Sequence, residues 1–204
     1  PSPQAIRCLS SFKSLHHYKW SNLILISQSI EEVVTRQVIE PKYENQLKSK
    51  IEVLKEITNK VSSKVREQYE ESPYPRWMST GISLNPSLLS DEIKKLNIRL
   101  FDMKINDVEA PNILIAGCGT GQQSISPASK IKNSKILAID LSLSSLAYAK
   151  RKTEELGIQN IDYMQADILD IGQLGRKFDV IKCSGVLHHM DEPMAGWRSL
   201  TDCL

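Results

Sequence analysis

The chain has 204 residues, of which 41% are hydrophobic and 25% are charged, and its formal net charge is +2. This length allows one substantial domain with a smaller attachment, and so weak a charge gives no electrostatic reason to expect binding to nucleic acid or to a membrane surface. The four cysteines are scattered without CxxC spacing or a Cys/His cluster, so we expect free thiols and no metal site.

No apolar run reaches the roughly 18 residues that a membrane-spanning helix needs, and no secretory leader is visible. We therefore expect a cytoplasmic protein without membrane contact. The chain begins with proline and stops inside a predicted helix, so we also expect it to be a fragment of a longer protein.

Glycine usage divides the sequence, because the first 80 residues contain none and eight of the nine glycines lie from Gly117 onward. Tight turns therefore belong to the second half. We predict a helical region at 1–72, a linker with a pre-domain helix at 73–110, and an α/β domain at 111–204.

In the first half, apolar residues recur every three or four positions from Leu47 to Tyr69, which predicts one amphipathic helix. Thr58 and Asn59 can interrupt it, because both residues favour helix caps over helix interiors. The prolines in the segment 71–77 exclude a helix there. A further helix is predicted at 87–104.

The second half alternates between strands and helices. Strands are predicted at 112–116, 135–140, 161–165 and 178–184, and the clearest helix is at 142–156. This order predicts a Rossmann-like, doubly wound parallel sheet, which binds ligands at the carboxyl ends of its strands. With only four strands visible, we expect a C-terminally truncated sheet whose last strand is an unpaired edge.

The first predicted strand runs into a glycine loop, Gly117-Cys-Gly-Thr-Gly121. Alternating glycines allow a tight turn and a close approach of the backbone to a ligand at a helix N-terminus. A dinucleotide fingerprint requires GxGxxG and a P-loop requires a lysine, and the loop has neither. A plain strand-to-helix turn is the remaining alternative.

Each later strand also ends in a group that can bind a ligand. Asp140, 19 residues after Gly121, can accept hydrogen bonds from ribose hydroxyls or can cap the next helix. Asp167 can accept a hydrogen bond from an adenine amine, with Ile168 against the ring, or can belong to a turn. Ser184 and Gly185 follow the fourth strand.

Taken together, these residues resemble the class I S-adenosylmethionine-dependent methyltransferases. The glycine loop, the acidic ends of strands two and three, and the segments Phe178-Asp-Val-Ile181 and Leu187-His-His189 carry this resemblance, which covers about 112–204. It implies that S-adenosyl-L-methionine is the cofactor. The implied cofactor-binding residues are Ala116, Gly117, Cys118, Gly119, Thr120, Gly121, Asp140, Leu141, Ala166, Asp167, Ile168, Ser184 and Gly185.

The sequence departs from the family pattern at Ile115, where many relatives have Asp or Glu. Contacts to the methionine end of the cofactor should therefore differ here. Methyl transfer from a sulfonium is an in-line displacement that depends on alignment, and a general base is needed only if the acceptor loses a proton. No catalytic residue is identified; His188 and His189 are the candidates for such a base, with a structural histidine pair as the alternative.

The segment from Arg66 to Trp77 is similar to one that precedes the methyltransferase domain in bacterial proteins with tetratricopeptide repeats. The resemblance implies that residues 1–60 are the end of a helical repeat region, which could bind a protein partner. Tyr69, Tyr74 and Trp77 are candidates for a lid over the cofactor, with packing of the preceding helix as the alternative.

The sequence does not identify the methyl acceptor, which is a small molecule or a protein. Two other functions are retained as alternatives. A nicotinamide-dependent oxidoreductase is disfavoured by the glycine spacing and by the lack of a Tyr-x-x-x-Lys pair, and a non-catalytic adaptor would use its helical half to bind a partner.

Overall fold

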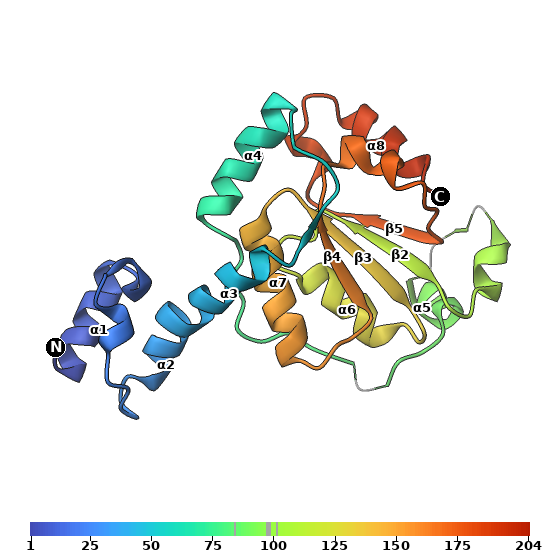
Figure 1. The fold of residues 1–204 in the computed structure, drawn as a ribbon. Helices are drawn as coiled ribbons and strands as arrows, with labels where there is room; N and C mark the ends of the chain where they lie inside the picture. Colours follow the sequence, from blue (N-terminus) through green and yellow to red (C-terminus); the bar gives the residue numbers. More distant parts are fainter. Residues whose placement is uncertain (84, 97–98, 101) are drawn as a thin grey trace. The chain divides into compact units, whose positions relative to one another are not determined.

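The computed structural model describes residues 1–83, 85–96, 99–100 and 102–204, and the chain forms two compact units, Pro1–Lys50 and Ile51–Leu204 (Figure 1). The division at Lys50 differs from the predicted helical region, which extended to residue 72. Residues 51–72 belong to the unit with the sheet, because they contain a strand that pairs with it.

The first unit is helical, as predicted, and has its own apolar cluster of Ile6, Leu15, Ile30, Val34 and Val38. The Gln37 side chain ties this unit together, since it accepts a hydrogen bond from the Leu15 N–H and donates one to the Ser10 carbonyl. Its elements are α1 (Pro3–Phe12), η1 (Leu15–His17), η2 (Ser21–Leu23), α2 (Glu31–Val34), the π-helical turn η3 (Thr35–Ile39) and α3 (Glu40–Lys48).

The predicted single helix from Leu47 to Tyr69 is wrong. It is replaced by the end of α3, a short strand β1 (Glu52–Val53) and α4 (Lys60–Glu71). β1 pairs in parallel with the third predicted strand, so a pairing more than 100 residues away along the chain overrides the local helical period. The interruption at Thr58-Asn59 is confirmed, because the Asn59 side chain accepts hydrogen bonds from the first N–H groups of α4.

The second unit contains a five-stranded parallel sheet in the order β1-β4-β3-β2-β5. Its other strands are β2 (Asn112–Ala116), β3 (Lys135–Asp140), β4 (Ile161–Gln165) and β5 (Val180–Cys183). These four strands confirm the predicted ones, and β5 lies at the sheet edge as expected. The strand that the prediction missed is β1, which is only two residues long.

Helices flank this sheet and complete a Rossmann-like fold (Figure 1). α6 (Gln122–Lys130) and α7 (Leu143–Glu155), the latter predicted at 142–156, contact β3 and β4. η5 (Ile168–Leu174) and α8 (Pro193–Thr201) contact each other, and Ile171 and Leu200 join the core residues Leu114 and Ile139 of the sheet. The apolar residues of the strands and of the flanking helices therefore form one core, which holds the strands in place.

The predicted helix at 87–104 is shorter in the structure. α5 spans Leu89–Leu96 and η4 (Met103–Asp107) follows, while positions 97, 98 and 101 lie outside the described residues. Across the described parts of the chain, no helix combines the length and apolarity needed to cross a membrane.

Candidate functional site

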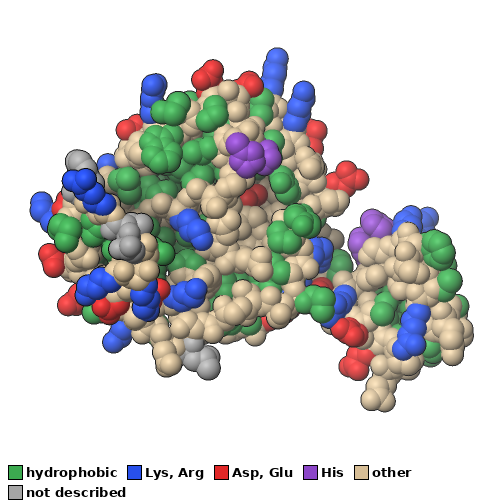
Figure 2. Space-filling view, turned by 180° about the vertical axis from the view of Figure 1, so that it is seen from behind, with side chains coloured by type: hydrophobic (Ala, Val, Ile, Leu, Met, Phe, Trp, Pro, Cys, Tyr) green, Lys and Arg blue, Asp and Glu red, His purple; other side chains and the backbone are tan. Residues whose placement is uncertain are grey.

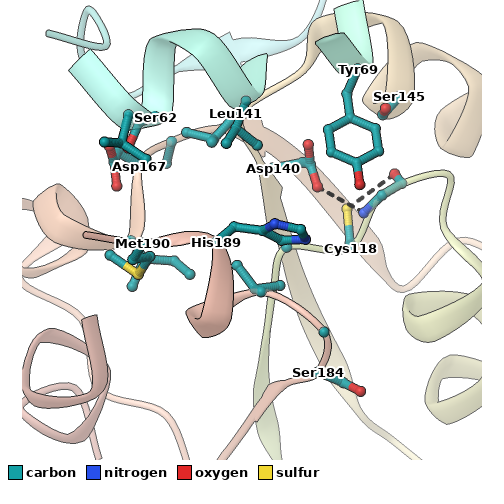
Figure 3. A pocket seen from close by; sticks show the side chains of 18 of the residues that line it. Ser62, Tyr69, Cys118, Asp140, Leu141, Ser145, Asp167, Ser184, His189 and Met190 are labelled. Carbon is teal, nitrogen blue, oxygen red and sulfur yellow. Dashed lines mark hydrogen bonds between the residues drawn. The ribbon is translucent and has the colours of Figure 1, made fainter. Parts of the chain in front are cut away.

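A pocket of about 610 Å³ lies at the carboxyl ends of the strands, within the second unit (Figure 3). Because parallel strands all point to this edge, the groups that follow them meet there. Most of the residues proposed as a ligand site line the pocket, namely Gly117, Cys118, Gly119, Thr120, Asp140, Leu141, Ala166, Asp167, Ile168, Ser184 and Gly185. Ala116 and Gly121 do not line it.

The glycine loop is shaped by two close approaches. Gly117 has φ +72°, and a Cβ at this position would lie 2.2 Å from a methyl group of Val186. Gly121 has φ +93°, and a Cβ there would lie 2.7 Å from the Cβ of Ala149 in α7. Gly121 thus makes room for helix packing rather than for a pocket occupant, which explains why it lies outside the pocket wall.

Asp140 connects the glycine loop to the start of α7. Its Oδ2 accepts a hydrogen bond of 2.8 Å from the Gly119 N–H, and its Oδ1 accepts one of 3.0 Å from the Ser142 N–H. Burial raises the pKa of the Asp140 carboxyl, the two backbone hydrogen bonds oppose this shift, and the nearby Glu70 carboxylate adds to it. The N-cap of α7 is Ser142, whose hydroxyl accepts a hydrogen bond from the Ser145 N–H. Of the two alternatives that the sequence left open for Asp140, the helix cap is therefore wrong, and the residue is a pocket carboxylate that fixes the backbone before the helix.

The third strand brings Asp167 into the pocket. Asp167 is 5% exposed, and its Oδ1 accepts a hydrogen bond of 3.0 Å from the Leu169 N–H. Its Oδ2 has no hydrogen-bond partner among the residues that the structure describes, and Asp167 points into the cavity in Figure 3. A turn fixes this side chain while leaving one oxygen for a donor in the pocket.

The two histidines of the candidate pair differ in their position relative to the pocket. His189 lines the pocket and His188 does not, although their ring centroids are only 4.0 Å apart. Both are exposed and lie in η6 (Leu187–His189). Of the two candidates for a general base, His189 alone is placed to contact a pocket occupant.

Ile115 is buried in β2 and does not line the pocket. Cys118, in the glycine loop, does line the pocket. Burial is the main cause that raises the pKa of its thiol well above the ordinary value, and the charge of Asp140 adds to this shift. Cys118 is therefore a neutral thiol at physiological pH, not an activated nucleophile. In the described part of the chain, no group of three or more His, Cys, Asp or Glu side chains is arranged to hold a metal ion.

One wall of the pocket comes from α4 and the segment after it, outside the glycine-rich half. Of the proposed lid residues, Tyr69 and Tyr74 line the pocket, whereas Trp77 is buried and anchors the segment. The Trp77 indole N–H donates to the Thr120 carbonyl at 2.9 Å, and the Thr120 hydroxyl donates to the Pro75 carbonyl at 2.6 Å. These reciprocal bonds hold the segment against the glycine loop.

Sequence reasoning missed several pocket residues. Val61 and Val65 of α4 could have been found, because they share one apolar helical face with the lid candidate Tyr69, and this face lines the pocket. The other missed residues had no comparable signal and are brought in by tertiary contacts; they are Asn59, Ser62, Pro75, Gln122, Gln123, Ser145, Leu169, Val186, Met190, Asp191, Glu192 and Ala195.

Glu70, also unforeseen, fixes α4 to α7. Its carboxylate accepts hydrogen bonds from the Ser144 N–H at 3.0 Å and from the Ser142 hydroxyl at 3.1 Å. A carboxylate at the N-terminus of a helix is favoured by the helix dipole and by the unpaired N–H groups there. The α4 wall and the Asp140 end of the sheet are therefore one connected structure.

Parts of the chain are similar to known proteins. Residues 113–204 match a family model described as a methyltransferase domain. An uncharacterized protein of Synechococcus sp. is 39% identical over 95 residues, which are 46% of this chain and 23% of that protein. The ubiquinone biosynthesis O-methyltransferase of Actinobacillus pleuropneumoniae is 28% identical over 142 residues, which are 67% of this chain and 58% of that enzyme. The chain thus spans less than two thirds of the length of these relatives.

Two solved structures share the fold. The magnesium protoporphyrin IX methyltransferase of Synechocystis with bound SAH has a TM-score of 0.51 at 21% identity, over 70% of this chain and 68% of that one. The cyclase SpnF has a TM-score of 0.50 at 21% identity, over 70% of this chain and 56% of that one. These two neighbours carry the names of different reactions, so the fold by itself does not specify the chemistry. Residues 113–204 match the methyltransferase domain family, and the second unit has the Rossmann-like fold of the class I S-adenosylmethionine-dependent methyltransferases.

Proposed function

We propose that the protein transfers a methyl group from S-adenosylmethionine to an acceptor that is a small molecule or a protein. One observation carries this proposal: the groups that follow β2, β3, β4 and β5 converge on a single pocket in the part of the chain that matches a methyltransferase domain. A pocket of about 610 Å³ has the size of a typical small-molecule or cofactor site.

The pocket residues fit the parts of this cofactor. The Asp140 carboxylate would accept hydrogen bonds from the ribose hydroxyls, and the free Oδ2 of Asp167 would accept one from the adenine amine. Ile168 and Leu141 would pack against the adenine ring. Gly117 and Gly119 of the glycine loop would pass beneath the ribose and the methionine part.

Pocket charge favours a cation over a phosphate-bearing ligand. The described lining residues include four carboxylates, Asp140, Asp167, Asp191 and Glu192, and no Lys or Arg. The sulfonium cofactor carries a net positive charge, whereas a nicotinamide dinucleotide carries a diphosphate that these carboxylates would repel. Charge therefore supports methyl transfer over the alternative of a nicotinamide-dependent oxidoreductase.

When bound, the cofactor supplies a methyl group on a positively charged sulfur, which an acceptor can take in an in-line displacement. The protein contributes alignment and shielding from water. Tyr69 and Tyr74 line one wall of the pocket. If the acceptor must lose a proton, His189 is the imidazole on the pocket wall that can accept it, and His188 would act only through its contact with His189.

The helical unit Pro1–Lys50 is proposed to bind a protein partner. This unit has an apolar cluster of its own. Its descent from a tetratricopeptide-repeat region stays a prediction.

Cofactor titration tests the proposed function. The protein is expected to bind S-adenosylmethionine and S-adenosylhomocysteine in calorimetry and not to bind NADH, because of the pocket carboxylates. Incubation with isotope-labelled S-adenosylmethionine and candidate metabolites or proteins, followed by mass spectrometry, should then reveal a labelled acceptor. Binding of NADH without S-adenosylmethionine would support the oxidoreductase, and cofactor binding without any labelled product would favour the adaptor.

The raised pKa of Asp140 predicts opposite effects of pH on cofactor binding and on stability. Cofactor affinity is expected to fall as pH decreases through this raised pKa, because the protonated carboxyl accepts ribose hydrogen bonds less well. The stability of the ligand-free protein should instead increase as pH decreases through this range. Because the folded-state pKa lies above the ordinary value, this group contributes stability that is present below the ordinary value and is lost as pH rises through the raised one.

Asp140→Asn provides the control for both effects, since its amide does not titrate. Calorimetric titrations and urea unfolding from pH 4 to pH 8 should show the two trends in the wild-type protein and their reduction in the variant. Identical pH profiles for the two proteins would contradict this assignment of the pKa shift.

A further inference from the structure

Ser145 has a buried hydroxyl that no group among the described residues satisfies. It is the third residue of α7, it is 1% exposed, and it lines the pocket. Its Oγ has no hydrogen-bond partner in the described part of the chain. A buried hydroxyl without a partner destabilises a folded protein, so its retention calls for an explanation.

Three other buried or half-buried hydroxyls in the helices of this unit, those of Ser124, Thr153 and Ser199, bond to a carbonyl three or four residues earlier in the chain. The Ser124 hydroxyl donates to the Gly121 carbonyl at 2.9 Å, and the Thr153 hydroxyl donates to the Ala149 carbonyl at 2.9 Å. The Ser199 hydroxyl does the same with the Ala195 carbonyl at 3.1 Å. This bond to the preceding turn is the usual solution for Ser and Thr in a helix. The Ser145 hydroxyl does not form this bond, and Ser145 lines the pocket.

Ser145 is held in a fixed relation to Asp140. The Ser145 N–H donates to the Ser142 hydroxyl at 3.1 Å, and the Ser142 N–H donates to Asp140 Oδ1 at 3.0 Å. In Figure 3 the side chains of Tyr69, Asp140 and Ser145 are drawn on the same side of the pocket. Tyr69 also lines the pocket. The unsatisfied hydroxyl therefore belongs to the part of the pocket that contains the Asp140 carboxylate.

We propose that Ser145 is a further cofactor-binding residue, whose hydroxyl forms a hydrogen bond with a ribose hydroxyl of S-adenosylmethionine beside Asp140. This inference rests on the proposed function. A carboxylate can only accept hydrogen bonds, whereas a serine hydroxyl can also donate one. A ribose hydroxyl that donates to Asp140 can at the same time accept from Ser145. The carboxylates of Asp140 and Glu70 would repel the methionine carboxylate from this place, which leaves the neutral ribose as the matching group.

The experiment uses Ser145→Ala and measures calorimetric affinity for S-adenosylhomocysteine and for its 2′-deoxy and 3′-deoxy analogues. Loss of one hydrogen bond should weaken binding of S-adenosylhomocysteine about three- to tenfold. For the analogue that lacks the bonded hydroxyl, wild type and variant should bind equally. The melting temperature of the ligand-free variant should equal or exceed that of the wild type, because an unsatisfied buried hydroxyl has been removed.

Ser124→Ala is the matched control. Ser124 is fully buried in α6 and outside the pocket wall, and its hydroxyl bonds to the Gly121 carbonyl and contacts the Tyr163 hydroxyl at 3.2 Å. This variant should lower the melting temperature of the ligand-free protein without a selective effect between the analogues. The contrast separates a ligand-binding hydroxyl from a structural one.

Unchanged affinity of Ser145→Ala for S-adenosylhomocysteine would overturn the inference, and so would an equal loss for all three ligands. In both cases the proposed function would stand, because the wild-type protein would still bind the cofactor. If the wild-type protein bound neither S-adenosylmethionine nor S-adenosylhomocysteine, the proposed function itself would fail, and the inference with it.

Discussion

Replacing Asp140 by alanine is expected to weaken binding of S-adenosylmethionine by about two orders of magnitude, or ~2.7 kcal/mol. Hydrogen bonds to a charged group contribute about 1.5–3 kcal/mol each, and the variant loses those that the carboxylate would accept from the ribose. It also loses the bonds from the Gly119 and Ser142 N–H groups, which fix the glycine loop relative to α7. Calorimetric titration of the variant with S-adenosylmethionine measures the loss.

Asp162→Ala is the matched control for this substitution. Asp162 is an exposed aspartate of the neighbouring strand β4 and lies outside the pocket wall. It should leave cofactor affinity unchanged. If Asp140→Ala kept wild-type affinity, Asp140 would serve only to fix the backbone of the glycine loop and of Ser142, and the cofactor would have to bind elsewhere in the pocket.

Replacing Gly117 by alanine is expected to lower the free energy of unfolding by about 2–5 kcal/mol and to abolish cofactor binding. A left-handed backbone conformation costs a residue with a Cβ about 1–2 kcal/mol, and Gly117 has φ +72°. The added Cβ would lie 2.2 Å from Val186 Cγ2, so the loop or the Val186 side chain must move. Such overpacking costs about 1–3 kcal/mol. Urea unfolding measures the change in free energy.

Gly157→Ala separates the two contributions. Gly157, after the end of α7, has a similar φ of +68°, but a Cβ there would meet nothing within 4 Å. This variant should show only the conformational cost of about 1–2 kcal/mol. Combining Gly117→Ala with Val186→Ala should recover part of the stability that the clash removes. Equal destabilisation by the two glycine substitutions would show that the contact with Val186 is unimportant.

The sheet and its ligand edge were predictable because their signals are local. β2, β3, β4 and β5 read as short apolar runs bounded by turn residues, which is typical of buried parallel strands. The glycine loop, Asp140 and Asp167 could be placed at the same edge before the structure was known, because parallel strands all end on one side. Local chemistry and topology thus determined which glycines and carboxylates meet at this edge of the sheet.

The wall formed by α4 was decided by tertiary structure. The apolar residues from Leu47 to Tyr69 fit a continuous helix, yet Glu52 and Val53 pair with Met164 and Gln165 of β4. A two-residue strand has no periodic signal of its own, so only its distant partner can specify it. This break redirects α4, and Glu70 then connects it to α7.

By itself, the sequence determined the fold of the sheet unit and the identity of the carboxylates and glycines at its ligand edge. Only the tertiary structure decided how these residues are used. It turned Gly121 towards Ala149, placed His189 but not His188 on the pocket wall, and left the Ser145 hydroxyl unsatisfied. The physical reason is that strand and turn signals arise from neighbours in the chain, whereas the direction and partner of a side chain depend on contacts between distant segments.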